Sequence, residues 1–221
     1  MSFADDFLAS VRSSQRVLLT GPEGPDGDSF GACLALQIAL AAVAPGVQVF
    51  AAGEAGFRYD WLPGASGLVD DKSLTLAYDG VVVLDGDAGR LLSGADRAFR
   101  SAGWTGIIDH HRSTKGDAYT LPWLDHHYES TCVMVRELFR AWDVPLTKDG
   151  ATLLYTGLIF DTGAFRYSNT HSGSHLLAAE LLSFDIEHHR ICERVLMNRR
   201  LPGLKLYARI IDQARFLADN R

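Results

Sequence analysis

The stretch RVLLTGPEGPDGDSFGACLALQIALAAVAPGVQVFAA, residues 16–52, contains the features that decide the fold. It opens with the apolar run Arg16–Thr20, which is typical of a buried strand. A loop rich in Gly, Pro and Asp follows, and then a helical pattern over Ser29–Ala44 and a second strand pattern at Gly46–Ala52. A strand, a helix and another strand in this order predict two parallel strands joined by a helix.

The same alternation continues along the chain. Val81–Leu84 reads as a third strand, a helical stretch lies near Arg90–Ser101, and Gly106–Ile108, led in by Trp104, reads as a fourth strand. Near-continuous apolar runs are typical of parallel strands that are buried on both faces. We therefore expect an α/β fold, a parallel β-sheet flanked by helices.

After about Tyr119 the pattern becomes mostly helical, which predicts a helical C-terminal third. The segments with apolar residues at helical spacing are Ser130–Trp142, Lys148–Phe160, Gly173–Phe184, Ile186–Met197 and Gly203–Asp219. We expect one catalytic domain over residues 1–190. Residues 191–221 are expected to form a helical extension, or a linker to a second domain that is absent from this sequence.

The composition excludes several classes of protein. The chain has 221 residues, 47% hydrophobic and 22% charged, which is ordinary for a globular protein and argues against disorder. Its net charge of −6 argues against a broad basic surface for long nucleic acids. Apolar stretches are too short to span a bilayer, the N-terminus lacks the basic start of a signal peptide, and the 3 cysteines make no CxxC pair. We expect a cytoplasmic protein with no membrane partner.

Acidic residues recur at one kind of position, at or just after the C-terminal end of a predicted strand or helix. They are Asp26 and Asp28 in GPEGPDGDSFG, Asp85 in VVVLD, Asp109 with His110 and His111 in GIIDHH, and Asp161 after LLYTGLIF. Ligands bind at the carboxyl ends of the strands in open α/β sheets. Carboxylates crowded there repel one another, and a divalent cation removes that conflict.

Each motif also has a structural explanation. PDGD is a common turn sequence, and Asp85 or Asp87 is a candidate N-cap for the following helix. Adjacent histidines are usually incidental, and the chain has three such pairs. Because all of these motifs occur in order at the ends of predicted elements, we favour a metal site.

The ordered set PDGDSFGA, VVVLDGDAGR, IIDHH and LYTGLIFDTGAFRYSNT resembles the four motifs of the DHH phosphoesterases. The resemblance runs from about Arg16 to about Leu182. It is stronger for the subgroup of nano-RNases, phosphoadenosine-phosphate phosphatases and RecJ-type exonucleases than for the family II pyrophosphatases. A second DHH string, Asp125–His127, precedes the expected start of a helix rather than ending a strand. We therefore interpret Asp109–His111 as the motif and the second string as a coincidence.

The resemblance implies a two-metal site, with Asp85 bridging the ions as a catalytic residue. Asp26 and Asp85 would bind one metal, and Asp28, Asp85, His110 and Asp161 would bind the other. His111, as a catalytic residue, would either sit just outside the metal ligands or touch the substrate phosphate. Arg166 would steady a phosphate oxygen, with a surface or structural role as the alternative. Oxygen ligands with one imidazole suit Mn²⁺, with Mg²⁺ as the alternative.

Two departures from the family pattern stand out. The first motif normally begins with a His three residues before the Pro of PDGD, and Pro22 stands there. We therefore expect one tight metal site and one weak one, and leave open whether Glu23 or His126 supplies the lost ligand. The chain also has no GG dipeptide for the family's glycine-rich substrate loop. Either the sequence is truncated, or the domain acts with a smaller or separate substrate platform.

The leading hypothesis is a metal-dependent phosphoesterase that hydrolyses a small nucleotide or a short oligonucleotide, with homo-oligomerisation left open. The alternative is a degenerate family member that binds a nucleotide or a protein partner without turnover, which Pro22 favours. An inorganic pyrophosphatase is a weaker alternative, because DTGAFRYSNT argues against it.

Overall fold

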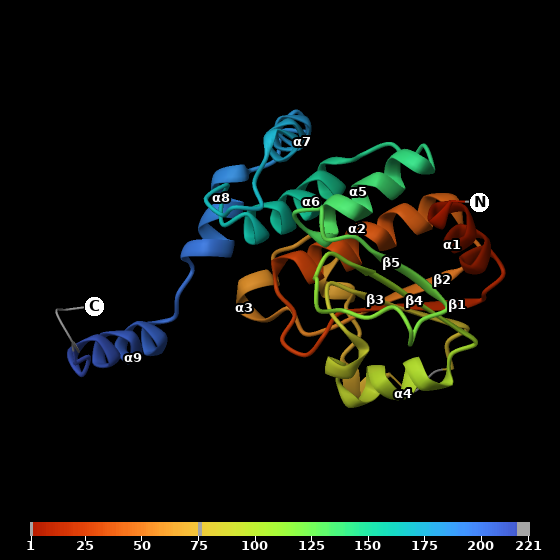
Figure 1. Ribbon diagram of the computed structural model, residues 1–221, viewed down its shortest axis with the longest axis horizontal. Helices are drawn as coiled ribbons and strands as arrows, with labels where there is room; N and C mark the ends of the chain where they lie inside the picture. The colour runs from red at the N-terminus through yellow and green to blue at the C-terminus, as the bar shows by residue number, and fades with distance from the viewer. Residues whose placement is uncertain (1, 75–76, 216–221) are drawn as a thin grey trace.

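A five-stranded sheet forms the centre of the protein in this computed structural model, which describes residues 2–74 and 77–215 (Figure 1). The strands are β1 (Arg16–Thr20), β2 (Gln48–Ala52), β3 (Gly80–Leu84), β4 (Trp104–Asp109) and β5 (Leu121–Leu124). Their order in the sheet is β2-β1-β3-β4-β5, and every neighbouring pair is parallel. The predicted α/β class with a parallel sheet is confirmed.

Because the strands are parallel and in register, their carboxyl ends lie together at one end of the sheet. Thr20 pairs with Ala52 across β1 and β2, and Leu84 pairs with Ile108 across β3 and β4. The chain leaves β1 toward β2 on one side and returns through β3 on the other side of β1. The point between β1 and β3 is therefore a topological switch point, where ligands bind in open α/β sheets.

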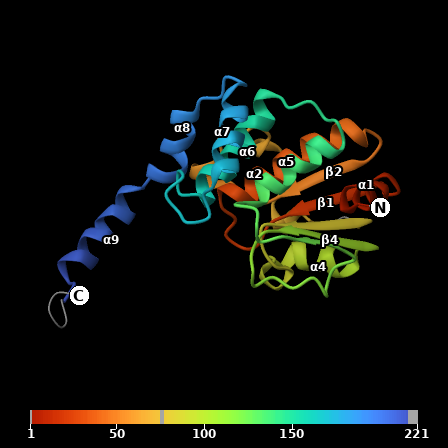
Figure 2. The same cartoon turned by 45° about the horizontal axis from the view of Figure 1, so that its top comes forward.

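Helices cover both faces of the sheet. In Figure 2, α2 (Gly27–Val43), α5 (Thr131–Ala141) and α6 (Lys148–Asp161) lie on one face, and α4 (Ser93–Ser101) lies on the other. Helix α2 packs closely on α6: a Cβ added at Gly31 would lie 2.6 Å from the carbonyl oxygen of Leu153. The fully buried Leu34, Leu36 and Leu40 anchor α2 in the core, and burying such side chains contributes about 1.5–3 kcal/mol each.

The C-terminal third is helical, as expected. Helices α7 (Ser172–Leu182) and α8 (His188–Cys192) follow α6, and α8 continues into a π-helical turn at Glu193–Met197. Helix α9 (Leu201–Asp212) has no buried residue and points away from the body of the molecule (Figure 1). Its predicted continuation over residues 216–219 lies outside the described residues, and the predicted division of the chain at residue 190 stays a prediction. Within residues 2–74 and 77–215, no helix is long and apolar enough to cross a membrane.

Two helices and one strand were not expected from the sequence. Helix α1 (Phe3–Arg12) begins with a capping box between Ser2 and Asp5, and it buries Phe7 and Val11. Strand β5 pairs with β4 at the edge of the sheet and contains Pro122, a residue that argues against a central strand but is tolerated at an edge. A short helix, α3 (Gly56–Tyr59), follows β2.

Candidate metal centre

The loop after β1 brings two carboxylates to the switch point. Asp26 is the N-cap of α2, and its Oδ1 accepts hydrogen bonds from the backbone N–H of Asp28 at 2.9 Å and of Ser29 at 3.3 Å. An Asp at this position stabilises the first turn of a helix. The turn places Asp28 one residue inside α2, where it is fully buried.

The carboxylate of Asp28 receives the first N–H groups of another helix. The N–H of Thr131 donates to Oδ2 at 2.6 Å, and the N–H of Cys132 donates to Oδ1 at 2.9 Å. Both residues belong to the first turn of α5, whose N-terminus carries unpaired N–H groups and a positive partial charge. Asp28 therefore links α2 to the start of α5, and the two hydrogen bonds fix the orientation of its carboxylate.

Asp85 follows β3 directly and has a left-handed backbone conformation, with φ of 62°. Such a conformation is uncommon outside glycine and costs of order 1–3 kcal/mol. Its N–H donates to the carbonyl oxygen of Ile108 at 3.1 Å, and its Oδ1 accepts from the hydroxyl of Thr131 at 3.4 Å. The strained turn places a buried carboxylate beside that of Asp28.

His110 and Asp161 complete a four-residue cluster. The Nε2 of His110 lies 2.9 Å from Oδ2 of Asp161, 3.6 Å from Oδ1 of Asp85 and 3.9 Å from Oδ2 of Asp28. One possible ligand atom from each of the four residues lies within 4.8 Å of all the others. His110 follows β4, and Asp161 is the last residue of α6.

The cluster fits a divalent cation. His110 Nε2 and Asp161 Oδ2 are buried, and neither makes a hydrogen bond despite their short separation. Buried polar atoms normally have a partner, so these two atoms indicate a ligand that they share. Three carboxylates and one imidazole are a donor set typical of Mn²⁺ or Mg²⁺.

The electrostatics of the cluster agree with this fit. Burial, and then the negative charge of Asp28, raise the pKa of Asp85 well above its usual value and raise the pKa of Asp161 to about 7. Burial alone lowers the pKa of His110, but the carboxylates of Asp161 and Asp85 outweigh it and raise that pKa to about 11. Burial and the charge of Asp28 also raise the pKa of Asp26. A cation relieves this accumulation of negative charge.

His111 is oriented by a buried carboxylate. Its Nδ1 lies 2.7 Å from Oδ1 of Asp109, whose Oδ2 accepts from the hydroxyl of Thr114 at 2.5 Å. Asp109 is fully buried, and the side chain of His111 is 50% exposed. The hydrogen bond to Asp109 raises the pKa of His111. With Nδ1 engaged, Nε2 of His111 is the ring atom free to meet a ligand.

The other predicted site residues lie around this cluster. Asp26 belongs to no group of three or more metal-binding side chains within the described residues, and neither does the exposed Glu23. His126 belongs to a separate group with Asp125 and His127, which shares no residue with the four-residue cluster. The exposed Arg166 donates through Nε to the carbonyl oxygen of Gly163 at 2.6 Å.

The sequence reasoning missed the residues that hold the cluster in place. The N–H groups of Thr131 and Cys132 orient Asp28. The sequence feature that indicates this helix start is Ser130, whose side chain caps α5. Asn169 in the DTGAFRYSNT segment donates to the carbonyl oxygens of Glu129 and Asp161, at 3.2 Å and 3.0 Å. The start of α5 and the end of α6 are thus tied together.

A parallel sheet with carboxylates and an imidazole gathered at its switch point defines an open α/β protein with a ligand site at the carboxyl ends of its strands. Within that class, the chain belongs to the DHH family, whose N-terminal domain matches residues 16–158. This agrees with the family that the motifs indicated.

Relatives of this chain carry names that describe phosphoester hydrolysis. A "Probable bifunctional oligoribonuclease and PAP phosphatase NrnA" from Streptococcus mutans is 26% identical over 181 residues, which is 81% of this chain and 56% of the relative. The bifunctional oligoribonuclease and PAP phosphatase NrnA of Bacillus subtilis is 28% identical over 185 residues, again 81% of this chain and 56% of the relative. The chain therefore spans about half the length of these relatives.

Solved structures share the fold. A crystal structure of an exopolyphosphatase-related protein from Bacteroides fragilis has a TM-score of 0.82 at 24% identity, covering 96% of this chain and 65% of that one. The exonuclease RecJ bound to manganese has a TM-score of 0.53 at 16% identity, covering 96% of this chain and 69% of that one. At these identities the similarity extends to the fold alone.

Proposed function

We propose that this chain is the catalytic domain of a divalent-metal-dependent phosphoesterase whose substrate is a small nucleotide or a short oligonucleotide. The observation that carries the proposal is the four-residue cluster, in which two buried polar atoms lack hydrogen bonds and two carboxylates have raised pKa values. The names of the relatives, oligoribonuclease and PAP phosphatase, support the substrate class.

In this proposal Asp28, Asp85, His110 and Asp161 hold one ion, and Asp26 with the bridging Asp85 holds a second. Mn²⁺ is the favoured metal, with Mg²⁺ as the alternative. Bound cations of this kind neutralise phosphate charge and lower the pKa of an attacking water.

The remaining roles belong to the protein's own residues. Asp109 accepts the Nδ1 proton of His111 and raises the pKa of the ring, and in the protonated ring Nε2 donates to a phosphate oxygen or to the leaving group. Arg166 is proposed to steady a phosphate oxygen with the guanidinium nitrogens that its Nε contact leaves free.

The net charge of −6 favours a compact substrate over a long polymer. Cytoplasmic location remains the prediction from the cysteine content.

The test is a measurement of bound metal per chain combined with a substrate screen. Dinucleotides, adenosine 3′,5′-bisphosphate, bis-p-nitrophenyl phosphate and pyrophosphate should be offered with Mn²⁺ or Mg²⁺, and Asp161→Asn is the matched control. Hydrolysis of a nucleotide phosphoester that is lost in Asp161→Asn supports the proposal. Turnover of pyrophosphate alone would move the assignment to a pyrophosphatase.

A second candidate is a nucleotide-binding protein without turnover, which Pro22 favours because one predicted metal site lacks an imidazole there. Nucleotide binding without hydrolysis of any phosphoester at saturating Mn²⁺ would support this alternative.

A further inference from the structure

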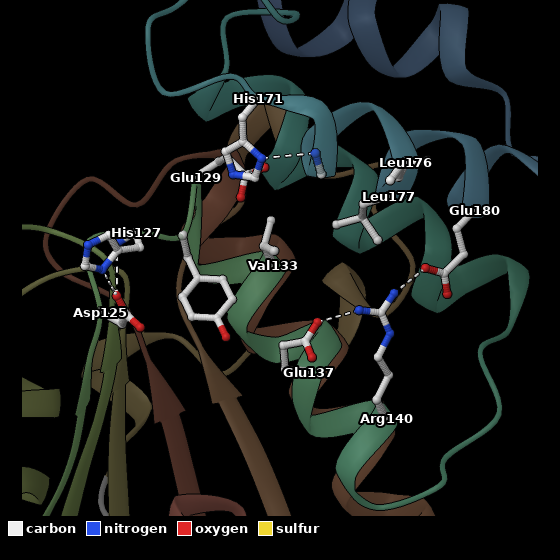
Figure 3. A pocket seen from close by; sticks show the side chains of 12 residues that line it. Asp125, His127, Glu129, Val133, Glu137, Arg140, His171, Leu176, Leu177 and Glu180 are labelled. Atoms are coloured by element: carbon white, nitrogen blue, oxygen red, sulfur yellow. Dashed lines mark hydrogen bonds and ion pairs between the residues drawn. The ribbon is translucent and has the colours of Figure 1, made fainter.

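A pocket of about 570 Å³ lies between the β5–α5 connection, α5 and α7 (Figure 3). Its apolar part comes from the buried Val133 and Leu177 and from Leu176, which is 72% exposed. The ring of Tyr128 also lines the pocket. This combination of an aromatic ring and aliphatic side chains suits a flat heterocycle, which stacks on such surfaces.

The polar feature of the pocket is Glu129, whose side chain is only 3% exposed. One of its oxygens, Oε1, accepts from the hydroxyl of Ser174 and lies 3.3 Å from Nε2 of His171. The Nδ1 of His171 accepts the N–H of Gly173 at 3.0 Å, so the proton of the neutral ring lies on Nε2, the nitrogen that faces Glu129. The second oxygen, Oε2, makes no hydrogen bond within the described residues. Glu129 is thus a rigid acceptor with an unused oxygen.

The charges around the pocket select the part of a substrate that enters it. Four carboxylates line it, those of Asp125, Glu129, Glu137 and Glu180, against the single guanidinium of Arg140. That guanidinium is already paired with Glu137 at 2.5 Å and Glu180 at 2.6 Å (Figure 3). The pocket therefore repels phosphate and favours an uncharged group that offers N–H donors.

Short connections link the pocket to the metal centre. The N–H of Asp125 donates to the carbonyl oxygen of Asp109 at 3.1 Å, and Asp109 holds His111. Glu129 lies two residues before Thr131, whose N–H binds Asp28. Two residues span at most about 7 Å, so the backbone of Glu129 lies within about 7 Å of the residue whose N–H binds Asp28.

We propose that this pocket binds the nucleobase of the substrate, and that Glu129 Oε2 accepts a hydrogen bond from an exocyclic amino group of the base. The proposal rests on the proposed phosphoesterase function and adds the substrate class of this site, which is nucleotides with an amino-bearing base. Adenosine meets the requirement, whereas uridine has no exocyclic amino group. Carboxylates recognise the amino groups of bases in this way in other nucleic-acid contacts.

The experiment uses nucleosides, which have no phosphate and cannot be hydrolysed. Binding of adenosine and of uridine is measured by calorimetry on the wild type and on Glu129→Gln. The glutamine keeps an oxygen for Ser174 and His171 and replaces Oε2 with an NH₂ donor. We expect adenosine to bind more tightly than uridine to the wild type, and Glu129→Gln to weaken adenosine binding by about tenfold or more.

A second pair of variants keeps the test decisive if Glu129→Gln fails to fold. Leu176→Trp narrows the mouth of the pocket from an exposed position on α7, and Leu182→Trp adds the same side chain to an exposed position on α7 outside the pocket. We expect the ratio of dinucleotide to bis-p-nitrophenyl phosphate hydrolysis to fall about tenfold in Leu176→Trp and to stay at the wild-type value in Leu182→Trp. The proposal is overturned if adenosine and uridine bind equally well to the wild type and to Glu129→Gln, and if Leu176→Trp leaves the hydrolysis ratio at the wild-type value. Selective adenosine binding in a protein that hydrolyses no phosphoester supports the pocket and overturns the proposed function instead.

Discussion

The Nε2 of His110 and the Oδ2 of Asp161 lie 2.9 Å apart, although one residue follows strand β4 and the other ends helix α6. Neither atom makes a hydrogen bond, and both face the carboxylates of Asp28 and Asp85. A sheet strand and a covering helix thus supply one shared ligand position. The sheet and the helix that covers it therefore meet at the position where the metal is expected.

The first prediction concerns the choice between the two DHH strings. His110→Ala should abolish metal-dependent hydrolysis and weaken Mn²⁺ binding at least about 100-fold, because changes outside the first ligand sphere already cost 10–100-fold in other proteins. His126→Ala is the matched control, since His126 is exposed and lies in a separate group. Both quantities are measured by calorimetry and by initial rates. Equal losses in the two variants would contradict the choice of Asp109–His111 as the motif.

The second prediction is a pH dependence of metal binding. The pKa of Asp161 is raised to about 7 and that of His110 to about 11, so at pH 6 both side chains carry a proton and at pH 8 only His110 does. A cation must displace these protons, and its affinity should therefore rise with pH. Calorimetry in buffers of different ionisation enthalpy should detect more protons released at pH 6 than at pH 8.

The same shifts fix the sign of the stability change in metal-free protein. Both pKa values are higher in the folded than in the unfolded chain, so the stability that these groups contribute is lost as the pH rises through the folded value. For Asp161 this loss falls between about pH 4 and pH 7. Metal-free protein should be less stable at pH 8 than at pH 6, and Mn²⁺ should stabilise it more at pH 8. Proton release that does not change with pH would show that these two groups are not ligands.

The third prediction separates two neighbouring carboxylates by their structural roles. Asp28→Asn should destabilise the metal-free protein by about 2–4 kcal/mol, because an amide cannot accept from both the Thr131 and the Cys132 N–H groups. The measurement is urea denaturation in the presence of a chelator. A loss under about 0.5 kcal/mol, the size of an ordinary surface substitution, would mean that Asp28 does not anchor α5.

The fourth prediction is the opposite result at Asp85. Asp85→Asn removes a buried carboxylate that is repelled by Asp28, and Asn tolerates the left-handed backbone at this position. The metal-free variant should be more stable than wild type by about 1–2 kcal/mol, and Mn²⁺ should no longer stabilise it. Denaturation with and without Mn²⁺ measures both effects. A less stable variant would show that Asp85 contributes more to packing than its charge costs.

The sequence predicted the parts of this fold whose signal is local. Apolar runs at β1 and β3 and the strand–helix alternation predicted the parallel sheet, because buried strands need continuous apolar residues. Strand β5 was missed because Pro122 argues against a strand unless the strand lies at an edge, and edge position depends on the tertiary structure.

The candidate site shows the same division. The positions of Asp28, Asp85, His110 and Asp161 at the ends of elements predicted that they converge, and the structure brings them together. The backbone N–H groups that hold Asp28 left no mark in residue type, because every residue except proline carries one. The pocket at Glu129 likewise depends on how α7 packs beside α5, which no short motif encodes.

The fifth prediction concerns Pro22, which stands where the family's first motif normally has a His. Pro22 packs against Gly86, the residue after Asp85: a Cβ added at Gly86 would lie 2.8 Å from Cγ of Pro22. A side chain at position 22 therefore lies next to the residue that follows the proposed bridging Asp85. Because proline has no donor atom, the second ion has only Asp26 and Asp85, and two carboxylates with waters hold Mn²⁺ or Mg²⁺ loosely.

A metal titration by calorimetry on wild type and Pro22→His tests this proposal of one tight and one weak site. The wild type should bind one Mn²⁺ tightly, with a second joining only at high Mn²⁺ or with substrate, since a phosphate oxygen completes the weak site. Pro22→His adds an imidazole beside Asp85 and should tighten the second ion by about 10–100-fold. Pro22→Ala, which removes the ring without adding a donor, is the matched control and should leave the second ion weak. Two equally tight sites in the wild type would mean that another side chain, with Glu23 and His126 the first to test by alanine substitution, has taken the place of the missing imidazole.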